Sequence, residues 1–74
     1  MAQAAEHYDV RRELLGLLLT KVAEDRYPSA TMMDLIEQLM GPDERVIYVQ
    51  VLLDKIRQDR MPSIPMMRRV LALG

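Results

Sequence analysis

Residues 25–33 of this chain, Asp-Arg-Tyr-Pro-Ser-Ala-Thr-Met-Met, return 34 residues later as Asp-Arg-Met-Pro-Ser-Ile-Pro-Met-Met at residues 59–67. When residues 17–40 are placed on residues 51–74, ten of the 24 positions are identical. A fixed period of this length is typical of a repeated structural unit. The sequence therefore predicts one unit made twice, with repeat 1 over residues 9–41 and repeat 2 over residues 42–74.

The first repeat predicts a long helix over residues 9–26 and a short helix over residues 30–40. Asp9 is suited to cap the long helix, because its carboxylate can accept a hydrogen bond from a free amide of the first turn. Pro28 disfavours helical backbone at the preceding residue, and Ser29 is a good cap for the short helix. Each unit is thus a helical hairpin closed by a Pro-Ser turn.

The second repeat predicts the same arrangement, with helices over residues 43–60 and 64–73 and Ser63 as the repeated cap. Residues 46–51 are rich in β-branched side chains and by themselves favour a strand. We nevertheless predict a helix there, because the run aligns with residues 12–17 of the first long helix. It also continues without a break into residues whose apolar spacing is helical.

The apolar pattern of the first long helix indicates the fold. Five apolar residues follow a spacing of three and four along it: Val10, Leu14, Leu17, Leu18 and Val22. Leu15 and Leu19 widen this stripe, so the helix is expected to touch more than one neighbour. We predict an all-α fold in which the two hairpins pack face to face about a pseudo-twofold axis as a compact four-helix bundle.

Pseudo-twofold packing predicts that equivalent residues, such as Leu18 and Leu52, are buried alike. A stack of repeats needs about three members to be stable. Two repeats must therefore close on themselves or on another chain. The sequence leaves open whether the bundle closes within one chain or by exchange of hairpins between two.

The length of 74 residues allows a single domain over residues 9–74, with residues 1–8 as a flexible tail. The chain has no cysteine, and His7 is its only histidine. Disulfides and thiolate metal sites are excluded, and one histidine does not make a zinc site. We therefore expect no metal and no cofactor.

The net charge is −1, with four basic and seven acidic residues in 1–41 against six basic and four acidic residues in 42–74. So small a net charge argues against general affinity for nucleic acid or for an anionic membrane. The longest apolar run, Leu14 to Leu19, is far too short to span a bilayer. The N-terminus lacks the pattern of a signal peptide, so a cytoplasmic location is expected.

The residues indicate binding rather than catalysis. The repeated Asp25-Arg26 and Asp59-Arg60 pairs resemble a doubled acid/base site, but a structural role at the helix ends is favoured. We expect a non-catalytic protein–protein interaction module that binds itself, as a homodimer or another homo-oligomer, or serves as an adaptor for a larger protein. The expected apolar contacts are Met33, Leu35, Met67, Val70 and Leu71. Arg68 and Arg69 are expected to lie opposite Asp34 and Glu37 of another copy, orienting the contact.

Helix-turn-helix DNA binding is the alternative function. Four arginines make the second hairpin the basic part of the chain: Arg57, Arg60, Arg68 and Arg69. The short helix over residues 64–73 would then enter a groove of the duplex. Against this, that helix is otherwise almost wholly apolar, whereas reading base edges requires a polar outer face.

Overall fold

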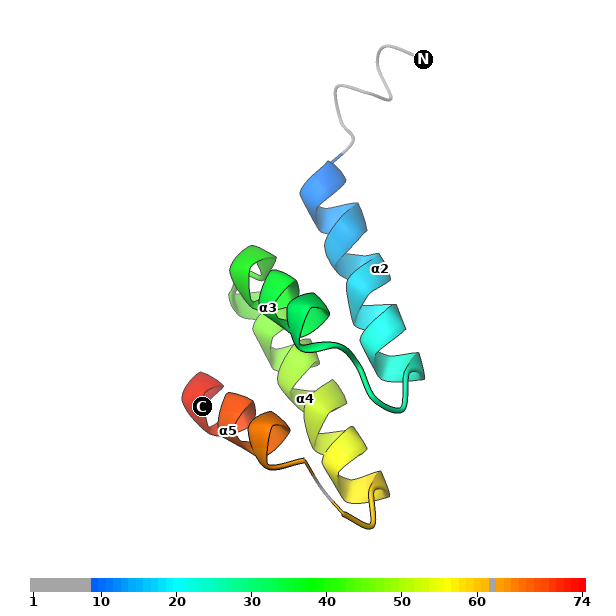
Figure 1. The fold of residues 1–74 in the computed structure, drawn as a ribbon. Helices are drawn as coiled ribbons and strands as arrows, with labels where there is room; N and C mark the ends of the chain where they lie inside the picture. Colours follow the sequence, from blue (N-terminus) through cyan, green and yellow to red (C-terminus); the bar gives the residue numbers. More distant parts are fainter. Residues whose placement is uncertain (1–8, 62) are drawn as a thin grey trace.

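The computed structural model describes residues 9–61 and 63–74, and in these residues the chain forms four α-helices (Figure 1). They are α2 (Val10–Glu24), α3 (Ala30–Leu39), α4 (Pro42–Gln58) and α5 (Ile64–Leu73). No strand occurs in the described part, and residues 46–51 lie inside α4. The predicted all-α fold is confirmed. The tail predicted for residues 1–8, which includes His7, lies outside the described residues.

The helix starts follow the predicted caps. Three capping side chains accept a hydrogen bond from the backbone amide three residues on, namely Asp9 at 3.1 Å, Ser29 at 3.0 Å and Ser63 at 3.2 Å. The start of α4 is different, because Gly41 has no side chain to offer. There the Gly41 amide donates to the Glu44 carboxylate at 2.7 Å, and Pro42 occupies the first helical position, where a missing amide costs little.

The long helices end two residues earlier than predicted. Asp25 and Asp59 have extended backbone, with ψ angles of 133° and 136°, and each closes its helix. Each turn therefore begins earlier than predicted, although proline restricts the backbone only of the residue directly before it. The residues that begin and end the two turns have similar backbone angles, Asp25 like Asp59 and Ser29 like Ser63, which agrees with the repeated sequence.

The two hairpins lie next to each other in the same orientation. Helix α3 packs on α2, α5 packs on α4, and the contact of α2 with α4 joins the hairpins. Figure 1 shows that α2 and α4 run side by side in the same direction, and that α3 and α5 also run in a common direction. These contacts make the four-helix bundle that the repeat predicted.

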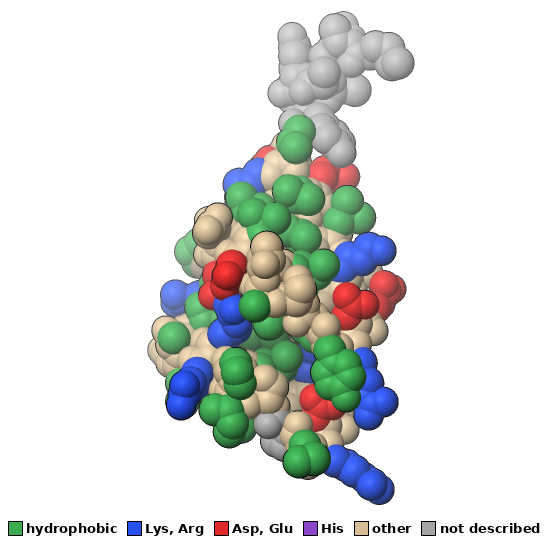
Figure 2. Space-filling model, viewed as in Figure 1, with side chains coloured by type: hydrophobic (Ala, Val, Ile, Leu, Met, Phe, Trp, Pro, Cys, Tyr) green, Lys and Arg blue, Asp and Glu red, His purple; other side chains and the backbone are tan. Residues whose placement is uncertain are grey.

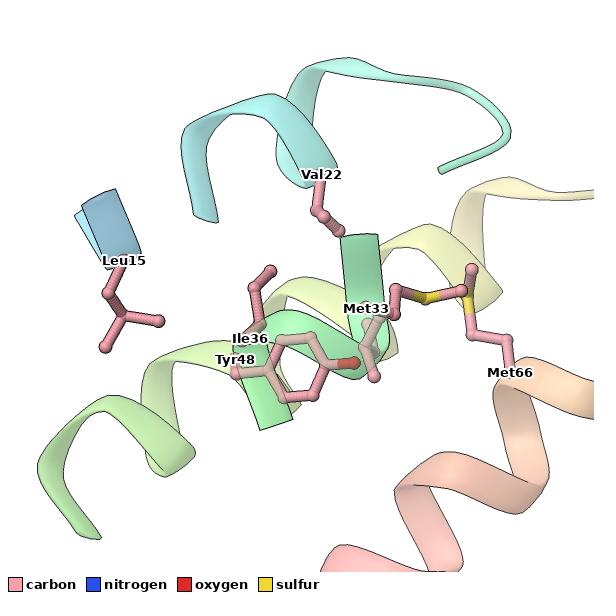
Figure 3. Packing of buried hydrophobic residues seen from close by; sticks show 7 residues of the cluster. Leu15, Val22, Met33, Ile36, Tyr48 and Met66 are labelled. Carbon is pink, nitrogen blue, oxygen red and sulfur yellow. The ribbon is translucent and has the colours of Figure 1, made fainter. Parts of the chain in front are cut away.

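The core lies between the hairpins and draws on every helix. Its buried hydrophobic residues are Leu15 and Val22 of α2, Met33 and Ile36 of α3, Tyr48 and Leu52 of α4, and Met66 of α5. Figure 3 shows the Tyr48 ring beside Ile36, with the ends of Met33 and Met66 turned toward each other. Flexible thioethers fill the space where α3 and α5 approach the long helices.

The side of α2 that faces the core differs from the one its spacing favoured. Val10, Leu14 and Leu17 are 65%, 40% and 63% exposed, whereas Leu15 is buried. Val22 is buried as predicted. A helix that is apolar on several sides does not reveal by spacing alone which side meets its neighbour.

The two hairpins bury different positions of the repeat. Repeat 1 buries Leu15, Val22, Met33 and Ile36, and their equivalents Val49, Ile56, Met67 and Val70 are half-buried. Repeat 2 buries Tyr48, Leu52, Lys55 and Met66, and their equivalents Leu14, Leu18, Lys21 and Met32 are exposed or half-buried. A twofold axis would bury equivalent residues alike. The hairpins therefore meet through different faces, and the expectation of equal burial for Leu18 and Leu52 is wrong.

This difference predicts unequal effects of the same substitution. Leu52→Ala removes a side chain with no exposed surface and should lower the free energy of unfolding by about 2–5 kcal/mol. Leu18→Ala removes a half-buried side chain and should cost about 1–2 kcal/mol. Urea unfolding of the two variants at one protein concentration measures the difference, and equal losses would contradict the burial described above.

Candidate interaction surface

One polar cluster joins the two hairpins. The Tyr48 hydroxyl of α4 donates to the Glu37 carboxylate of α3 at 2.6 Å. The Arg69 guanidinium of α5 donates to the same carboxylate at 2.8 Å and pairs with Asp34 at 2.8 Å. Glu37 is thus shared by a side chain from each helix of the second hairpin. Two hydrogen bonds on one carboxylate determine how the second hairpin sits on the first.

The cluster is electrostatically consistent at neutral pH. Burial raises the pKa of the Tyr48 phenol above its usual value of about 10, and the hydrogen bond to Glu37 raises it further. The hydrogen bond to Glu37 also raises the pKa of Arg69, and Asp34 adds to this effect. Tyr48 therefore remains a neutral donor, while Arg69 remains charged beside the two carboxylates.

A lysine makes the second polar contact between the hairpins. Lys55 is 8% exposed, and its ammonium donates to the backbone oxygens of Ala23, at 3.1 Å, and of Asp25. These oxygens lie at the C-terminal end of α2, where carbonyls lack helical partners and the helix dipole favours a cation. Asp25 thus takes part through its backbone oxygen. Nothing in the sequence around Lys55 indicates that this lysine is buried.

The predicted contact residues fall into three groups. Leu35 and Leu71 are 37% and 79% exposed and are available to a partner. Met67 and Val70 are half-buried, with Val70 packed against the core, and Met33 is buried in the core, which leaves Met33 little surface for a partner.

The predicted orienting charges meet inside one chain. Arg69 pairs with Asp34 and Glu37 of its own molecule, so these three side chains hold the hairpins together. Arg68 is exposed, and it is the one of the two arginines whose surface a partner can reach. The pairing of charges that the sequence suggested is present, but as an internal contact.

Further exposed apolar residues lie on the long helices, where contacts were not predicted. Large exposed side chains there include Val10, Leu14 and Leu17 of α2 and Val46 and Ile47 of α4. On the face seen in Figure 2, hydrophobic side chains reach the surface in several places between charged ones. For α2 the signal was an apolar stripe too wide for one neighbour, and its exposed part is the Val10, Leu14 and Leu17 side.

The hollows on the described part of the surface are open to solvent. A shallow hollow on the outer side of α4 and α5 is lined mainly by Val46, Val49, Leu53 and Leu73. Within residues 9–61 and 63–74, no group of three or more His, Asp or Glu side chains is placed to hold a metal ion. None of the described helices combines the length and the apolar character needed to cross a membrane.

Comparison with known proteins gives no relative: no family model, no curated protein and no solved structure matches the chain. The residues themselves therefore carry the functional argument.

The cluster predicts that two neighbouring arginines differ in their importance. Arg69→Ala removes one ion pair with the half-buried Glu37 and one with the exposed Asp34, and should lower the free energy of unfolding by about 1–3 kcal/mol. Arg68→Ala, the matched control on the exposed side, should change it by less than about 0.5 kcal/mol. Chemical denaturation measures both changes, and an equal response would show that the cluster does not stabilise the fold.

The buried phenol predicts a loss of stability in alkaline solution. The folded chain keeps the Tyr48 proton above pH ~10, where a tyrosine in the unfolded chain ionises. The unfolded state then binds fewer protons, so the free energy of unfolding falls as pH rises from about 10. Tyr48→Phe should lose less stability than the parent chain between pH 10 and 11. Tyr27→Phe, which changes a tyrosine that is 78% exposed, should follow the parent. Thermal unfolding over this range tests the comparison.

Proposed function

We propose that the chain is a non-catalytic protein–protein interaction module that associates with itself, with a larger protein as the alternative partner. The observation that carries this proposal is the distribution of its leucines. Leu14, Leu17, Leu35 and Leu71 are exposed, whereas the buried cluster in the described residues holds seven hydrophobic side chains. Exposed apolar side chains lose contact with water when a partner covers them, which favours association.

The size of the chain supports the same function. A domain of about 60–70 residues buries a smaller fraction of its unfolded surface than a larger domain does, and is marginal without further help. A partner that binds only the folded chain adds stability by mass action. Covering the exposed leucines therefore offers this fold both a function and additional stability.

DNA binding through the second hairpin is less well supported. Arg69 is engaged by Asp34 and Glu37, and Arg57 pairs with Asp54 at 2.6 Å. Carboxylates thus compensate two of the four arginines on which the helix-turn-helix alternative depends. Fewer arginines are then free to pair with DNA phosphates, so binding would release few counterions from the duplex.

Self-association predicts that both mass and stability depend on concentration. Light scattering from micromolar to millimolar chain should show the average mass rising above that of the monomer. The midpoint of thermal unfolding should rise over the same range, because the associated form binds only folded chains. A strict monomer at millimolar concentration, with a constant midpoint, would exclude self-association and leave the larger partner as the remaining form of the proposal.

A further inference from the structure

The unequal burial of the two repeats shows how the hairpins stack. Both hairpins make the same internal contacts, and these contacts bury equivalent positions alike. A position that is buried in one hairpin and not in the other is therefore covered by a contact between the hairpins. We call the side of repeat 1 that meets repeat 2 its tail face: Leu15, Val22, Met33 and Ile36. We call the side of repeat 2 that meets repeat 1 its head face: Tyr48, Leu52, Lys55 and Met66.

Each face has a second copy at an end of the molecule. The tail face recurs on repeat 2 as Val49, Ile56, Met67 and Val70, all half-buried. The head face recurs on repeat 1 as Leu14, Leu18, Lys21 and Met32, of which Leu14 and Lys21 are exposed. The hairpins share one orientation, so the molecule presents a head face at one end and a tail face at the other (Figure 1). The shallow hollow beside Val49 lies at the tail end.

The lysine of the internal contact is repeated at the open head face. Lys55 holds the C-terminal end of α2 through the oxygens of Ala23 and Asp25. Lys21 is its equivalent and is exposed. The C-terminal end of α4 reproduces the receiving geometry, because Asp59 closes it with backbone angles of −83° and 136°, against −76° and 133° at Asp25. The oxygens of Arg57 and Asp59 are therefore equivalent acceptors for a lysine from another copy.

The polar cluster is replaced at the open ends by apolar residues. Tyr48, Arg69 and Glu37 correspond to Leu14, Leu35 and Leu71, and Asp34 corresponds to Arg68. The three leucines are 40%, 37% and 79% exposed. If one copy stacked on the next as repeat 2 stacks on repeat 1, these leucines would meet in the contact between the two copies. Their exposure, which the single chain does not explain, follows from the same geometry that buries Tyr48.

We infer that the chain associates head to tail with further copies of itself, the tail face of repeat 2 receiving the head face of repeat 1 from the next molecule. This rests on the proposed function and specifies its partner and its geometry. Such a contact joins two different surfaces, so it extends into a ring or a filament instead of stopping at a twofold dimer. It also provides the additional repeats that a stack of two lacks.

Transplanting the internal cluster to the ends tests this geometry. The tail variant, Leu71→Glu/Arg68→Asp, gives repeat 2 the residues of repeat 1. The head variant, Leu14→Tyr/Leu35→Arg, gives repeat 1 the residues of repeat 2. Each variant alone brings polar groups against an apolar or like-charged face and should raise the dissociation constant by about tenfold or more. In an equimolar mixture the two variants can alternate. Each transplanted tail face then receives a transplanted head face, and each native tail face receives a native head face. The mixture should therefore regain the mass of the parent assembly.

Sedimentation velocity of the parent, each variant and the mixture distinguishes the outcomes. Thr20→Asp is the matched control, since its equivalent in repeat 2 is Asp54 and both positions are exposed; it should assemble like the parent. Circular dichroism of the variants verifies folding. If the parent associates but mixing restores nothing, or if either variant assembles unaided like the parent, the head-to-tail geometry is overturned while self-association stands. If the parent does not associate, self-association itself fails.

Discussion

The structure depends on one shared carboxylate between two hairpins of the same design. Tyr48 is the largest fully buried side chain, and its hydroxyl is satisfied by Glu37, which Arg69 also engages. A buried polar group without a partner is costly, so the hydrogen bond to the half-buried Glu37 offsets the cost of burying the Tyr48 hydroxyl. The apolar core alone would tolerate several ways of laying one hairpin on another. The Tyr48–Glu37–Arg69 cluster selects one of them.

The same cluster is present where the two hairpins of one chain meet, and it is absent at the two ends of the molecule. Glu37 is opposite a tyrosine and an arginine inside the chain, whereas the head face at the free end offers Leu14 and Leu35 at the equivalent positions. A leucine cannot satisfy a carboxylate that is removed from water. The repeat 1 tail face is therefore matched to its own repeat 2, and a free head face is better suited to the apolar Leu71. The differences between the repeats thus give their equivalent surfaces different polarity.

Much of the local structure could be predicted because local rules govern it. Serine and aspartate caps, the Pro-Ser turns and the helical identity of residues 46–51 all followed from the two copies of one pattern. The candidate site was predicted in part: Leu35 and Leu71 are exposed, but Met33 is buried and Arg69 is engaged within its own chain. Lys55 went unnoticed because a lysine common to both repeats has no local signature of burial.

The residue pattern was enough to predict the repeated unit with its two helices and its turn, because caps, proline restrictions and apolar spacing act between residues close together in the chain. Tertiary structure alone decided which side of each helix is covered. Leu14 and Tyr48 occupy one position of the repeat, yet only Tyr48 is buried, because repeat 2 has a neighbour on that side and repeat 1 does not. Stacking one hairpin on another breaks their equivalence, and this loss of equivalence arises only when the two copies meet in space.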